Sequence, residues 1–286
     1  MITVHTIAEL REHVRNARMS GKRIGFVPTM GNLHAGHISL VDRANAETDY
    51  VVSSIFVNPL QFNDKTDLQR YPRPLPQDQE KLAAADCDLL FAPDVDEMYP
   101  NGQDEQSIVH VPVVSEGLCG GSRPGHFDGV STVVTKLFNQ VLPDAAFFGE
   151  KDFQQVAVIK KMVNDLCIPV EVVTVPTARA EDGLALSSRN GYLTDEERQL
   201  ATGLYKTLNE IADALNAGES LENSLSAASL RLEERGFRPD YVEVRSATDL
   251  SPAASGVAEV VILGAAFLGN ARLIDNLVVT LNRGIV

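Results

Sequence analysis

The segment Pro28-Thr-Met-Gly-Asn-Leu-His-Ala-Gly-His37 lies between a short apolar run, Arg23–Val27, and an amphipathic run, His37–Ala46. The apolar run is typical of a buried strand and the amphipathic run of a helix. In an open α/β sheet the loop after a strand faces ligands, and a helix N-terminus offers free N–H groups to anions. The segment therefore predicts an α/β fold with an anion site at this loop.

The same alternation of strand-like and helix-like runs continues to about residue 176. Expected strands are Arg23–Val27, Tyr50–Val57, Leu89–Ala92, Ala145–Phe148 and Val170–Val175. Expected helices are Ile7–Met19, His37–Ala46, Leu75–Ala85, Val130–Val141 and Phe153–Leu166. Strands separated by helices indicate a parallel sheet. We therefore expect a Rossmann-like, doubly wound domain over residues 1–176.

The pattern of polar and apolar residues changes after Pro176. A polar loop is followed by two helical patterns, Asp195–Asn216 and Leu221–Arg235, and then by three strand-like runs that end at Leu281. This order of elements predicts a smaller α+β domain over residues 177–286. We expect the polar loop of that domain to be a mobile loop that binds phosphate.

Charge and cysteine content exclude several classes of protein. The chain of 286 residues has 25 Lys and Arg against 39 Asp and Glu, a net charge of −14, which repels nucleic acids and anionic lipids. Cys87, Cys119 and Cys167 lie far apart and form no CxxC pair, which favours a reducing cytosol over a disulfide framework or structural zinc. The N-terminus lacks a signal-peptide pattern, and the apolar run Val257–Gly269 falls short of the roughly 20 residues that span a bilayer. We expect a mature cytoplasmic protein with no membrane segment.

His34 and His37 are three residues apart, so their rings share one face if the turn is helical. Paired imidazoles at such a place can donate hydrogen bonds to phosphate oxygens. The alternative is a glycine-rich loop with two surface histidines, and the spacing alone does not decide. The HxGH pattern resembles the HIGH signature of the nucleotidyltransferase superfamily, which favours the phosphate site.

The segment Phe147-Phe-Gly-Glu-Lys-Asp-Phe-Gln-Gln155 lies at a second strand-to-helix junction. Gly149 permits close approach of a ligand, Lys151 offers a point charge to phosphate, and Asp152 can hold Mg²⁺ or bind a ribose or ammonium group. Solvated charges that cap a helix are the alternative. Two junctions of this type in one sheet favour the phosphate interpretation.

The segment Leu186-Ser-Ser-Arg-Asn190 lies in the polar loop after Pro176. Its hydroxyls, backbone amides and Arg189 can clamp a triphosphate, although the segment taken alone fits an ordinary turn better. It occupies the place of the KMSKS loop of the nucleotidyltransferase superfamily, but it carries one arginine and no lysine.

Neutral amides follow the second expected strand in Phe56-Val-Asn-Pro-Leu-Gln-Phe62. Gln61, together with Gln155, can bind a small hydroxy acid without pairing its carboxylate, while Met30 and Phe62 form an apolar wall. A plain strand-ending turn at Asn58 and Pro59 is the alternative. In the loop from Gly120 to Gly129, Arg123 and His126 are left outside the predicted catalytic set.

The segments PTMGNLHAGH, FVNPLQF, SRPGHF, FFGEKDFQQ and LSSRNGYL resemble the pantothenate synthetase family in their order and spacing, and the likeness extends to ARLIDN at Ala271–Asn276. The resemblance implies that pantoate attacks the α-phosphorus of ATP, and that β-alanine then attacks the pantoyl adenylate. It also implies pantothenate, AMP and pyrophosphate as products, a requirement for Mg²⁺, and a homodimer.

The resemblance assigns residues to both ligands. Implied ATP-binding residues are Met30, Gly31, Asn32, Leu33, His34, Ala35, Gly36, His37, Gly149, Glu150, Lys151, Asp152, Ala178, Leu186, Ser187, Ser188 and Arg189. Implied pantoate or β-alanine contacts are Gln61, Gln155, Met30, Phe62 and Asn58. The family often has a larger apolar residue in place of Ala178, from which we expect a small effect on nucleotide fit. Asp152 is the one residue considered for Mg²⁺, and the direct ligands of the ion are not assigned.

The predicted catalytic residues are His34, His37, Lys151 and Arg189. The family's usual role for His37 is proton donation. A carboxylate nucleophile has no proton to lose, however, so we interpret all four side chains as stabilising negative charge in the transition state. Two alternatives remain: a nucleotidyltransferase that stops at adenylyl or cytidylyl transfer, and a non-catalytic nucleotide-binding protein.

Overall fold

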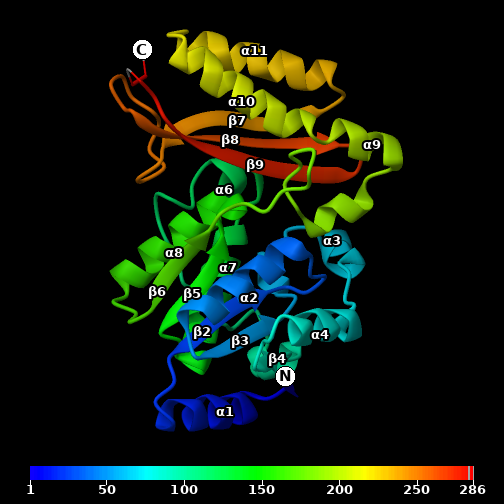
Figure 1. Ribbon diagram of the computed structural model, residues 1–286, viewed down its shortest axis with the longest axis vertical. Coiled ribbons are helices and arrows are strands. Elements are labelled where there is room, and N and C mark those ends of the chain that lie inside the picture. The colour runs from blue at the N-terminus through cyan, green and yellow to red at the C-terminus, as the bar shows by residue number, and fades with distance from the viewer. Residues whose placement is uncertain (283, 286) are drawn as a thin grey trace. The chain divides into compact units, whose positions relative to one another are not determined.

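The structure is a computed structural model that describes residues 1–282 and 284–285, and it divides into two compact units (Figure 1). The first unit contains Met1–Ser115, Arg123–Glu150 and Val158–Pro176. The second contains Glu116–Ser122, Lys151–Ala157 and Thr177–Val286. Two short segments from the first 176 residues thus belong to the second unit.

A parallel sheet forms the centre of the first unit. Its strands, in spatial order, are β1 (Ile2–Val4), β4 (Leu89–Phe91), β3 (Tyr50–Ile55), β2 (Ile24–Thr29), β5 (Ala145–Gly149) and β6 (Glu171–Val175). Every pairing is parallel, and Phe26 of β2 lies opposite both Val52 and Ala146. The predicted parallel sheet is therefore confirmed.

Helices cover both faces of this sheet. The helices that pack on it or on each other are α1 (Ile7–Met19), α2 (Ala35–Glu47), α4 (Leu75–Ala84) and α7 (His126–Val141). Because neighbouring side chains of a strand point to opposite faces, Val27 of β2 joins the cluster that contains Leu40 of α2. Phe26 instead meets Phe138 of α7, with ring centroids 6.4 Å apart. This arrangement confirms the doubly wound architecture.

Further helices and turns complete the description of the chain before residue 177. They are η1 (Pro59–Gln61), α3 (Lys65–Arg70), α5 (Val95–Met98), α6 (Leu118–Ser122), η2 (Glu150–Asp152) and α8 (Phe153–Asp165). Strand β1 was not predicted, because three residues carry too little alternation to be recognised; it forms by pairing with β4, Ile2 opposite Leu89. Helix α7 begins at His126 rather than Val130, directly after the left-handed Gly125.

The second unit is built on an antiparallel sheet in the order β7 (Arg238–Ser246), β8 (Glu259–Leu268) and β9 (Ala271–Thr280). Its other elements are η3 (Ser188–Tyr192), α9 (Asp195–Leu200), α10 (Gly203–Asn216) and α11 (Leu221–Glu234). Ile262 of β8 packs with Leu208 of α10 and Ala228 of α11. The opposite face of β8 packs with Leu118 of α6. The predicted α+β part is confirmed.

The prediction of a single helix over Asp195–Asn216 is wrong. The chain forms α9 and α10, separated by Ala201 and Thr202. Gly203, which is a poor helix former, opens α10 and packs so tightly that an added Cβ would lie 2.9 Å from Cε2 of Phe237. Among the described residues, no helix has both the length and the apolarity needed to cross a membrane.

Candidate functional site

The loop after β2 turns sharply through two left-handed residues. The φ angles are 80° at Gly31 and 51° at Asn32, a region that glycine enters freely and asparagine tolerates. A Cβ on Gly31 would lie 3.0 Å from Cγ2 of Ile55 and 3.1 Å from Oδ2 of Asp78. Glycine therefore lets the loop lie directly against the end of β3 and against α4.

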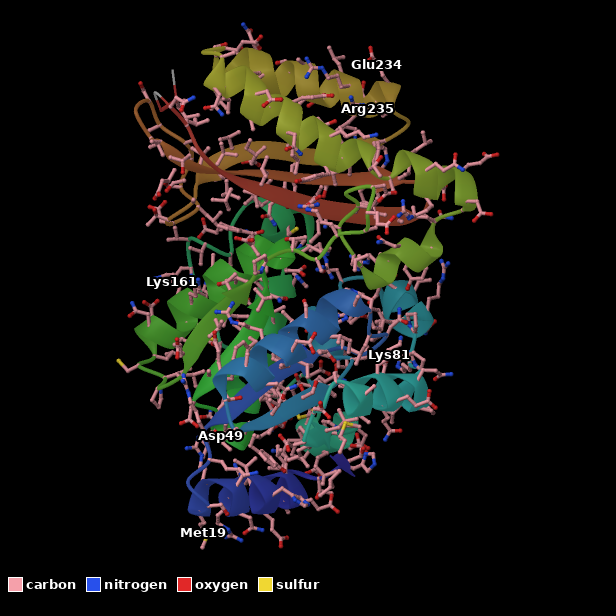
Figure 2. All side chains as sticks on the ribbon, viewed as in Figure 1. Met19, Asp49, Lys81, Lys161, Glu234 and Arg235 are labelled. Atoms are coloured by element: carbon pink, nitrogen blue, oxygen red, sulfur yellow. The ribbon has the colours of Figure 1, made fainter. Side chains whose placement is uncertain are left out.

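Helix α4 fixes this loop through two charged side chains. Asp78 is only 1% exposed, and its two oxygens accept the backbone N–H groups of Asn32 at 2.7 Å and Leu33 at 2.8 Å. Lys81, which is labelled on α4 in Figure 2, donates to the carbonyl of Leu33 at 2.6 Å. Neither residue was predicted from the sequence, because nothing in a helical pattern marks which of its charges is buried against a distant loop.

His34 and His37 form a reciprocal cap at the start of α2. His34 is the N-cap, and its Nδ1 accepts the N–H of Gly36 at 3.1 Å. Nδ1 of His37 accepts the N–H of His34 at 3.3 Å, and the two ring centroids are 4.1 Å apart. Since Nδ1 is an acceptor in both rings, the proton of each neutral imidazole is on Nε2. The cap therefore fixes two side-chain donors at a helix N-terminus, where anions are favoured.

Gln61 is held by its side-chain amide in the first unit. It is 7% exposed, its Oε1 accepts from Nδ2 of Asn58 at 3.1 Å, and its Nε2 contacts Sδ of Met30 at 3.0 Å. Asn58 is 1% exposed and also donates to the carbonyl of Gly129 at 3.0 Å. Tyr99 donates its hydroxyl to Oδ1 of Asn58 at 2.7 Å, and burial raises the pKa of Tyr99, which keeps that proton in place. Both amide atoms of Asn58 are thus used to orient its neighbours.

Arg123 and His126 hold the main chain of the same residue. Nδ1 of His126 donates to the carbonyl of Gln61 at 2.8 Å, and Arg123 donates to that carbonyl at 3.2 Å. Nη1 of Arg123 also lies 3.2 Å from Nε2 of His126. The loop from Gly120 to Gly129, for which no role was predicted, therefore supports a predicted ligand contact.

A pocket of about 410 Å³ opens in the first unit beside the ends of β2, β3 and β4. Its lining is Met30, Gly31, Ile55, Phe56, Val57, Pro59, Leu68, Arg73, Leu75, Asp78, Ala92, Pro93, Asp94 and Val95. The volume suits a small organic molecule, and the walls are mainly apolar. Met30 belongs to this lining, whereas the ring of Phe62 packs edge-on against Tyr71, with centroids 5.6 Å apart.

In the second unit, the predicted residues Lys151 and Asp152 lie in the turn η2. The side chain of Lys151 is 17% exposed, and its Nζ is 3.9 Å from Oδ2 of Asp152. The carbonyl of Lys151 accepts from Nδ2 of Asn276 at 3.0 Å. Gln154 is 4% exposed and accepts the N–H of Cys119 at 3.0 Å, while Gln155 is half-buried. Of the two glutamines, Gln154 has a structural role.

The polar loop of the second unit folds back on itself before Arg189. Leu186 donates its N–H to the carbonyl of Ala178 at 2.9 Å, so two predicted nucleotide contacts are neighbours. Ser187 caps η3, and its Oγ accepts the N–H of Arg189 at 3.2 Å. The half-buried Ser188 and Arg189 form the first residues of η3. Arg189 therefore lies on a short turn whose start is capped.

The remaining predicted contacts occupy the edges of these loops. Ala35 and Gly36 form the first turn of α2, while Gly149 ends β5 and Glu150 opens η2. Among the described residues, no cluster of three or more His, Cys, Asp or Glu side chains could enclose a metal ion.

The family model for "Pantoate-beta-alanine ligase" matches residues 2–278. The chain is 62% identical to a pantothenate synthetase of Stutzerimonas stutzeri, over 98% of this chain and 99% of that protein. It is 59% identical to a pantothenate synthetase of Azotobacter vinelandii, over 97% of this chain and 98% of that protein.

Two solved structures are also similar. The pantothenate synthetase of Thermus thermophilus has a TM-score of 0.90 and 48% identity, and the match covers 97% of this chain and 99% of that one. A pantoate-beta-alanine ligase of Francisella tularensis, complexed with beta-gamma ATP and beta-alanine, has a TM-score of 0.82 and 37% identity, with 97% of each chain covered. The likeness extends over both units of the chain.

Proposed function

Because the chain belongs to the pantoate–β-alanine ligase family, we propose that it uses ATP to condense pantoate with β-alanine. The observation that carries this proposal is the match over nearly the whole chain, which includes the paired histidines at the start of α2 and the Lys151 turn. Pantothenate, AMP and pyrophosphate would be the products.

The proposed reaction has two steps. A carboxylate oxygen of pantoate attacks the α-phosphorus of ATP, and the bond from that phosphorus to the bridging oxygen of pyrophosphate breaks. The amine of β-alanine then attacks the acyl carbon, the bond to AMP breaks, and the amine loses a proton to form the amide. Enclosure protects the acyl adenylate from water between the steps.

In the first unit, we assign Met30 to His37 to ATP. The Nε2–H groups of His34 and His37 donate to phosphate oxygens where negative charge grows, since their Nδ1 atoms are occupied by the helix cap. Gln61 binds pantoate with its amide, supported by Asn58, and Met30 and Phe62 supply apolar contacts. This division needs no proton transfer by His37.

We also assign Gly149 and Glu150, at the end of a segment of the first unit, to ATP. In the second unit, we assign Lys151, Asp152, Ala178 and the segment Leu186 to Arg189 to ATP. Lys151 and Arg189 supply positive charge to the phosphates. The half-buried Gln155 is assigned to pantoate.

Mg²⁺ fits this donor set as an ion that arrives with ATP. Magnesium is usually held by one or two carboxylates together with substrate phosphates, and Asp152 offers one carboxylate whose side chain is 47% exposed. When bound, the ion would neutralise charge on the phosphates. The protein's own cations, Lys151 and Arg189, would orient the chain of phosphates.

The test is a product analysis with the purified full chain, ATP, Mg²⁺, pantoate and β-alanine. Sustained release of AMP should require both acids. With ¹⁸O in the pantoate carboxylate, one label should appear in AMP, because the attacking oxygen stays on phosphorus. AMP without label would rule out the acyl-adenylate route.

The same assay separates the two alternatives. A nucleotidyltransferase would release pyrophosphate and accumulate a nucleotidyl product that β-alanine does not consume. A non-catalytic nucleotide-binding protein would bind ATP without turnover. We further propose a homodimer in the cytoplasm; light scattering coupled to gel filtration would give twice the 31.0 kDa chain mass for the dimer.

A further inference from the structure

The segment ARLIDN, Ala271–Asn276, is one of those that resemble the pantothenate synthetase family. The function proposed above gives it no role. It lies in β9, at the edge of the antiparallel sheet. Its last two residues are polar, yet Asp275 is 5% exposed and Asn276 is 4% exposed. Two adjacent buried polar residues on a strand need partners on both faces of the sheet.

Asp275 points to the face that α10 and α11 cover. Its neighbours two positions away, Leu273 and Leu277, pack in the clusters on that face, and side chains alternate along a strand. Asp275 binds Arg179 with both oxygens, Oδ2 to Nη1 at 2.7 Å and Oδ1 to Nη2 at 2.9 Å. A forked pair of this kind fixes the orientation of the guanidinium as well as its place.

Arg179 in turn holds the polar loop. Its Nη1 donates to the carbonyl of Gly183 at 3.1 Å, and its guanidinium lies 3.7 Å from the ring centre of Tyr205. The loop closes as a narrow hairpin in which Arg179 pairs with Ala185. Nδ2 of Asn190 then donates to the carbonyl of Ala185 at 3.1 Å. Asp275 thus anchors the hairpin that leads directly into the turn carrying Arg189.

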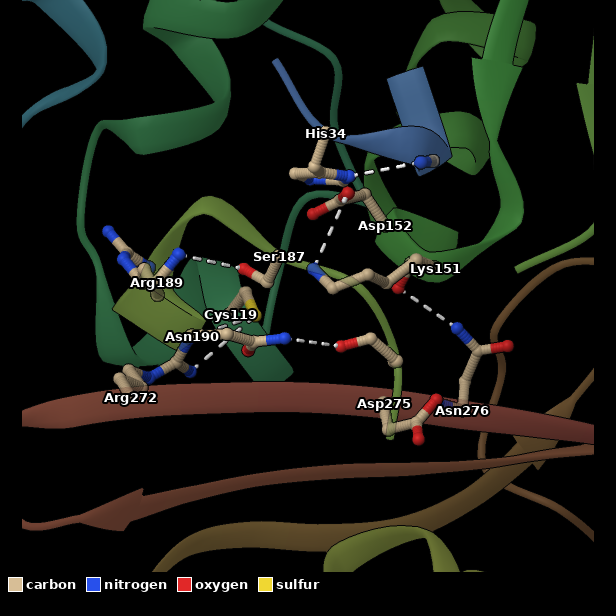
Figure 3. A network of polar contacts seen from close by, with 12 residues as sticks. His34, Cys119, Lys151, Asp152, Ser187, Arg189, Asn190, Arg272, Asp275 and Asn276 are labelled. Carbon is tan, nitrogen blue, oxygen red and sulfur yellow. Dashed lines mark hydrogen bonds and ion pairs between the residues drawn. The ribbon is translucent and has the colours of Figure 1, made fainter. Parts of the chain in front are cut away.

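Asn276 points to the opposite face of the sheet and holds the η2 turn, which carries Lys151. Its Nδ2 donates to the carbonyl of Lys151 at 3.0 Å (Figure 3). Its own N–H donates to Oδ1 of Asp275 at 2.8 Å, and its carbonyl accepts from Nη2 of Arg179 at 3.4 Å. Two consecutive residues of one strand therefore bind, on its two faces, the two segments that carry Lys151 and Arg189.

We propose that Asp275 and Asn276 are positioning residues that set Lys151 and Arg189 in register for adenylate formation. The expected loss of adenylate-forming rate rests on the proposed function. The anchoring of the two loops by β9 does not. Strand β9 pairs with β8 along its whole length, so it is a rigid support for two loops. A shift of about 1 Å in a group aimed at a transition state can cost about a hundredfold in rate.

The first experiment replaces the donor amide alone. Asn276→Asp keeps the shape of the side chain but puts an acceptor against the carbonyl of Lys151. The rate of pantoate-dependent exchange of pyrophosphate into ATP should fall by about ten- to a hundredfold, with the KM for pantoate little changed. Asn209→Asp is the matched control, because Nδ2 of Asn209 also donates to a backbone carbonyl, that of Tyr205 at 2.7 Å. The control should retain the full rate.

A double-mutant cycle separates positioning from general stability. If Asn276 acts through Lys151, then Asn276→Asp should cost no further rate in a Lys151→Ala background, whereas a purely structural loss would multiply. Asn276→Ala replaces Asn276→Asp in the cycle if the charged variant does not fold. Independent, multiplying losses would overturn the proposal.

Amide hydrogen exchange tests the inference without a measurement of enzyme activity. Asn276→Asp should speed amide exchange at residues 150–156, and Asp275→Asn should speed it at residues 179–190, relative to Asn209→Asp. Unchanged exchange in both segments would overturn the inference even if the enzyme is a ligase. If the wild-type protein shows no pantoate-dependent exchange of pyrophosphate into ATP, the proposed function is refuted. The amide-exchange rates of the variants would still decide whether Asp275 and Asn276 anchor the two loops.

Discussion

The Nδ1 atom of His37 accepts the backbone N–H of His34 at 3.3 Å, while Nδ1 of His34 accepts the N–H of Gly36. The same contacts that start α2 therefore determine that Nδ1 of each ring is the acceptor and that Nε2 carries the proton. Helix capping and phosphate binding are carried out by opposite sides of the same imidazoles. This relationship makes the two roles of His37 separable by substitution.

His37→Gln should retain more activity than His37→Asn. The amide nitrogen of Gln reaches about as far as Nε2, whereas the Asn amide reaches only as far as Nδ1 and can replace only the cap. We expect His37→Asn to lose about 10²–10³ in the rate of adenylate formation. Pyrophosphate exchange measures the rate, and thermal unfolding should show the opposite order, with Asn the more stable of the two variants. Equal rates would refute the assignment of Nε2 as donor.

Asp78→Asn should loosen the loop after β2. Both oxygens of Asp78 accept backbone N–H groups, and an amide can accept only one of them, so one buried donor loses its partner. The expected cost is about 1–3 kcal/mol in the free energy of unfolding, with a raised KM for ATP. Asp49→Asn is the control, since exposed Asp49 accepts a single N–H, from Arg23 at 2.9 Å, which an amide oxygen can replace. An unchanged KM for ATP would contradict the role of Asp78.

Gly129→Ala should displace Gln61. The added Cβ would lie 2.5 Å from the carbonyl carbon of Leu60 and 2.6 Å from the backbone nitrogen of Gln61, and backbone cannot move aside cheaply. Overpacking of this kind costs about 1–3 kcal/mol in stability. We expect the KM for pantoate to rise more than the KM for ATP. In Gly121→Ala, where the added Cβ meets nothing within 4 Å, both constants should stay at their wild-type values.

Glu210 should contribute stability that acid removes. Its hydrogen bond from Arg235, at 2.6 Å, lowers the pKa of its carboxyl, with Arg231 adding to the effect. Because the pKa is lower in the folded state, the ionised carboxyl stabilises the fold above the ordinary glutamate pKa of about 4.3. This contribution is lost progressively as the pH falls from there through the lowered pKa of the folded state.

The measurement compares the unfolding temperature of the wild type with that of Glu210→Gln at neutral pH and near pH 3. The difference should be modest at neutral pH, because the pair is partly exposed, and should become smaller in acid. Glu234→Gln, an exposed change on α11, is the control. A difference that grows in acid would show that the sign is wrong.

The sequence predicted the elements that local patterns specify. The apolar run of β2, the glycines of the following loop and the amphipathic α2 are all encoded within about 25 residues, so their order and the place of His34 and His37 could be predicted. Hydrophobic spacing likewise predicted the parallel sheet and the α+β character of the second part. The ordered motifs added the family, which spacing alone does not name.

Some elements depend on contacts that are distant in sequence. Strand β1 exists because Ile2–Val4 pair with Leu89–Phe91, and the break between α9 and α10 coincides with the packing of Gly203 against Phe237. Neither partner is visible from the local pattern. The predicted helix over Asp195–Asn216 followed periodicity, which continues across a bend without revealing it.

The sequence by itself determined which chemical groups the protein carries and the order in which they follow strands. Only the tertiary structure decided how they are held: Asp78 reaches back 46 residues to Asn32, and Asn276 reaches 125 residues to Lys151. The physical reason is that helical and strand periods arise from neighbours along the chain, whereas a buried carboxylate or amide gains its role from the one distant backbone group that satisfies it.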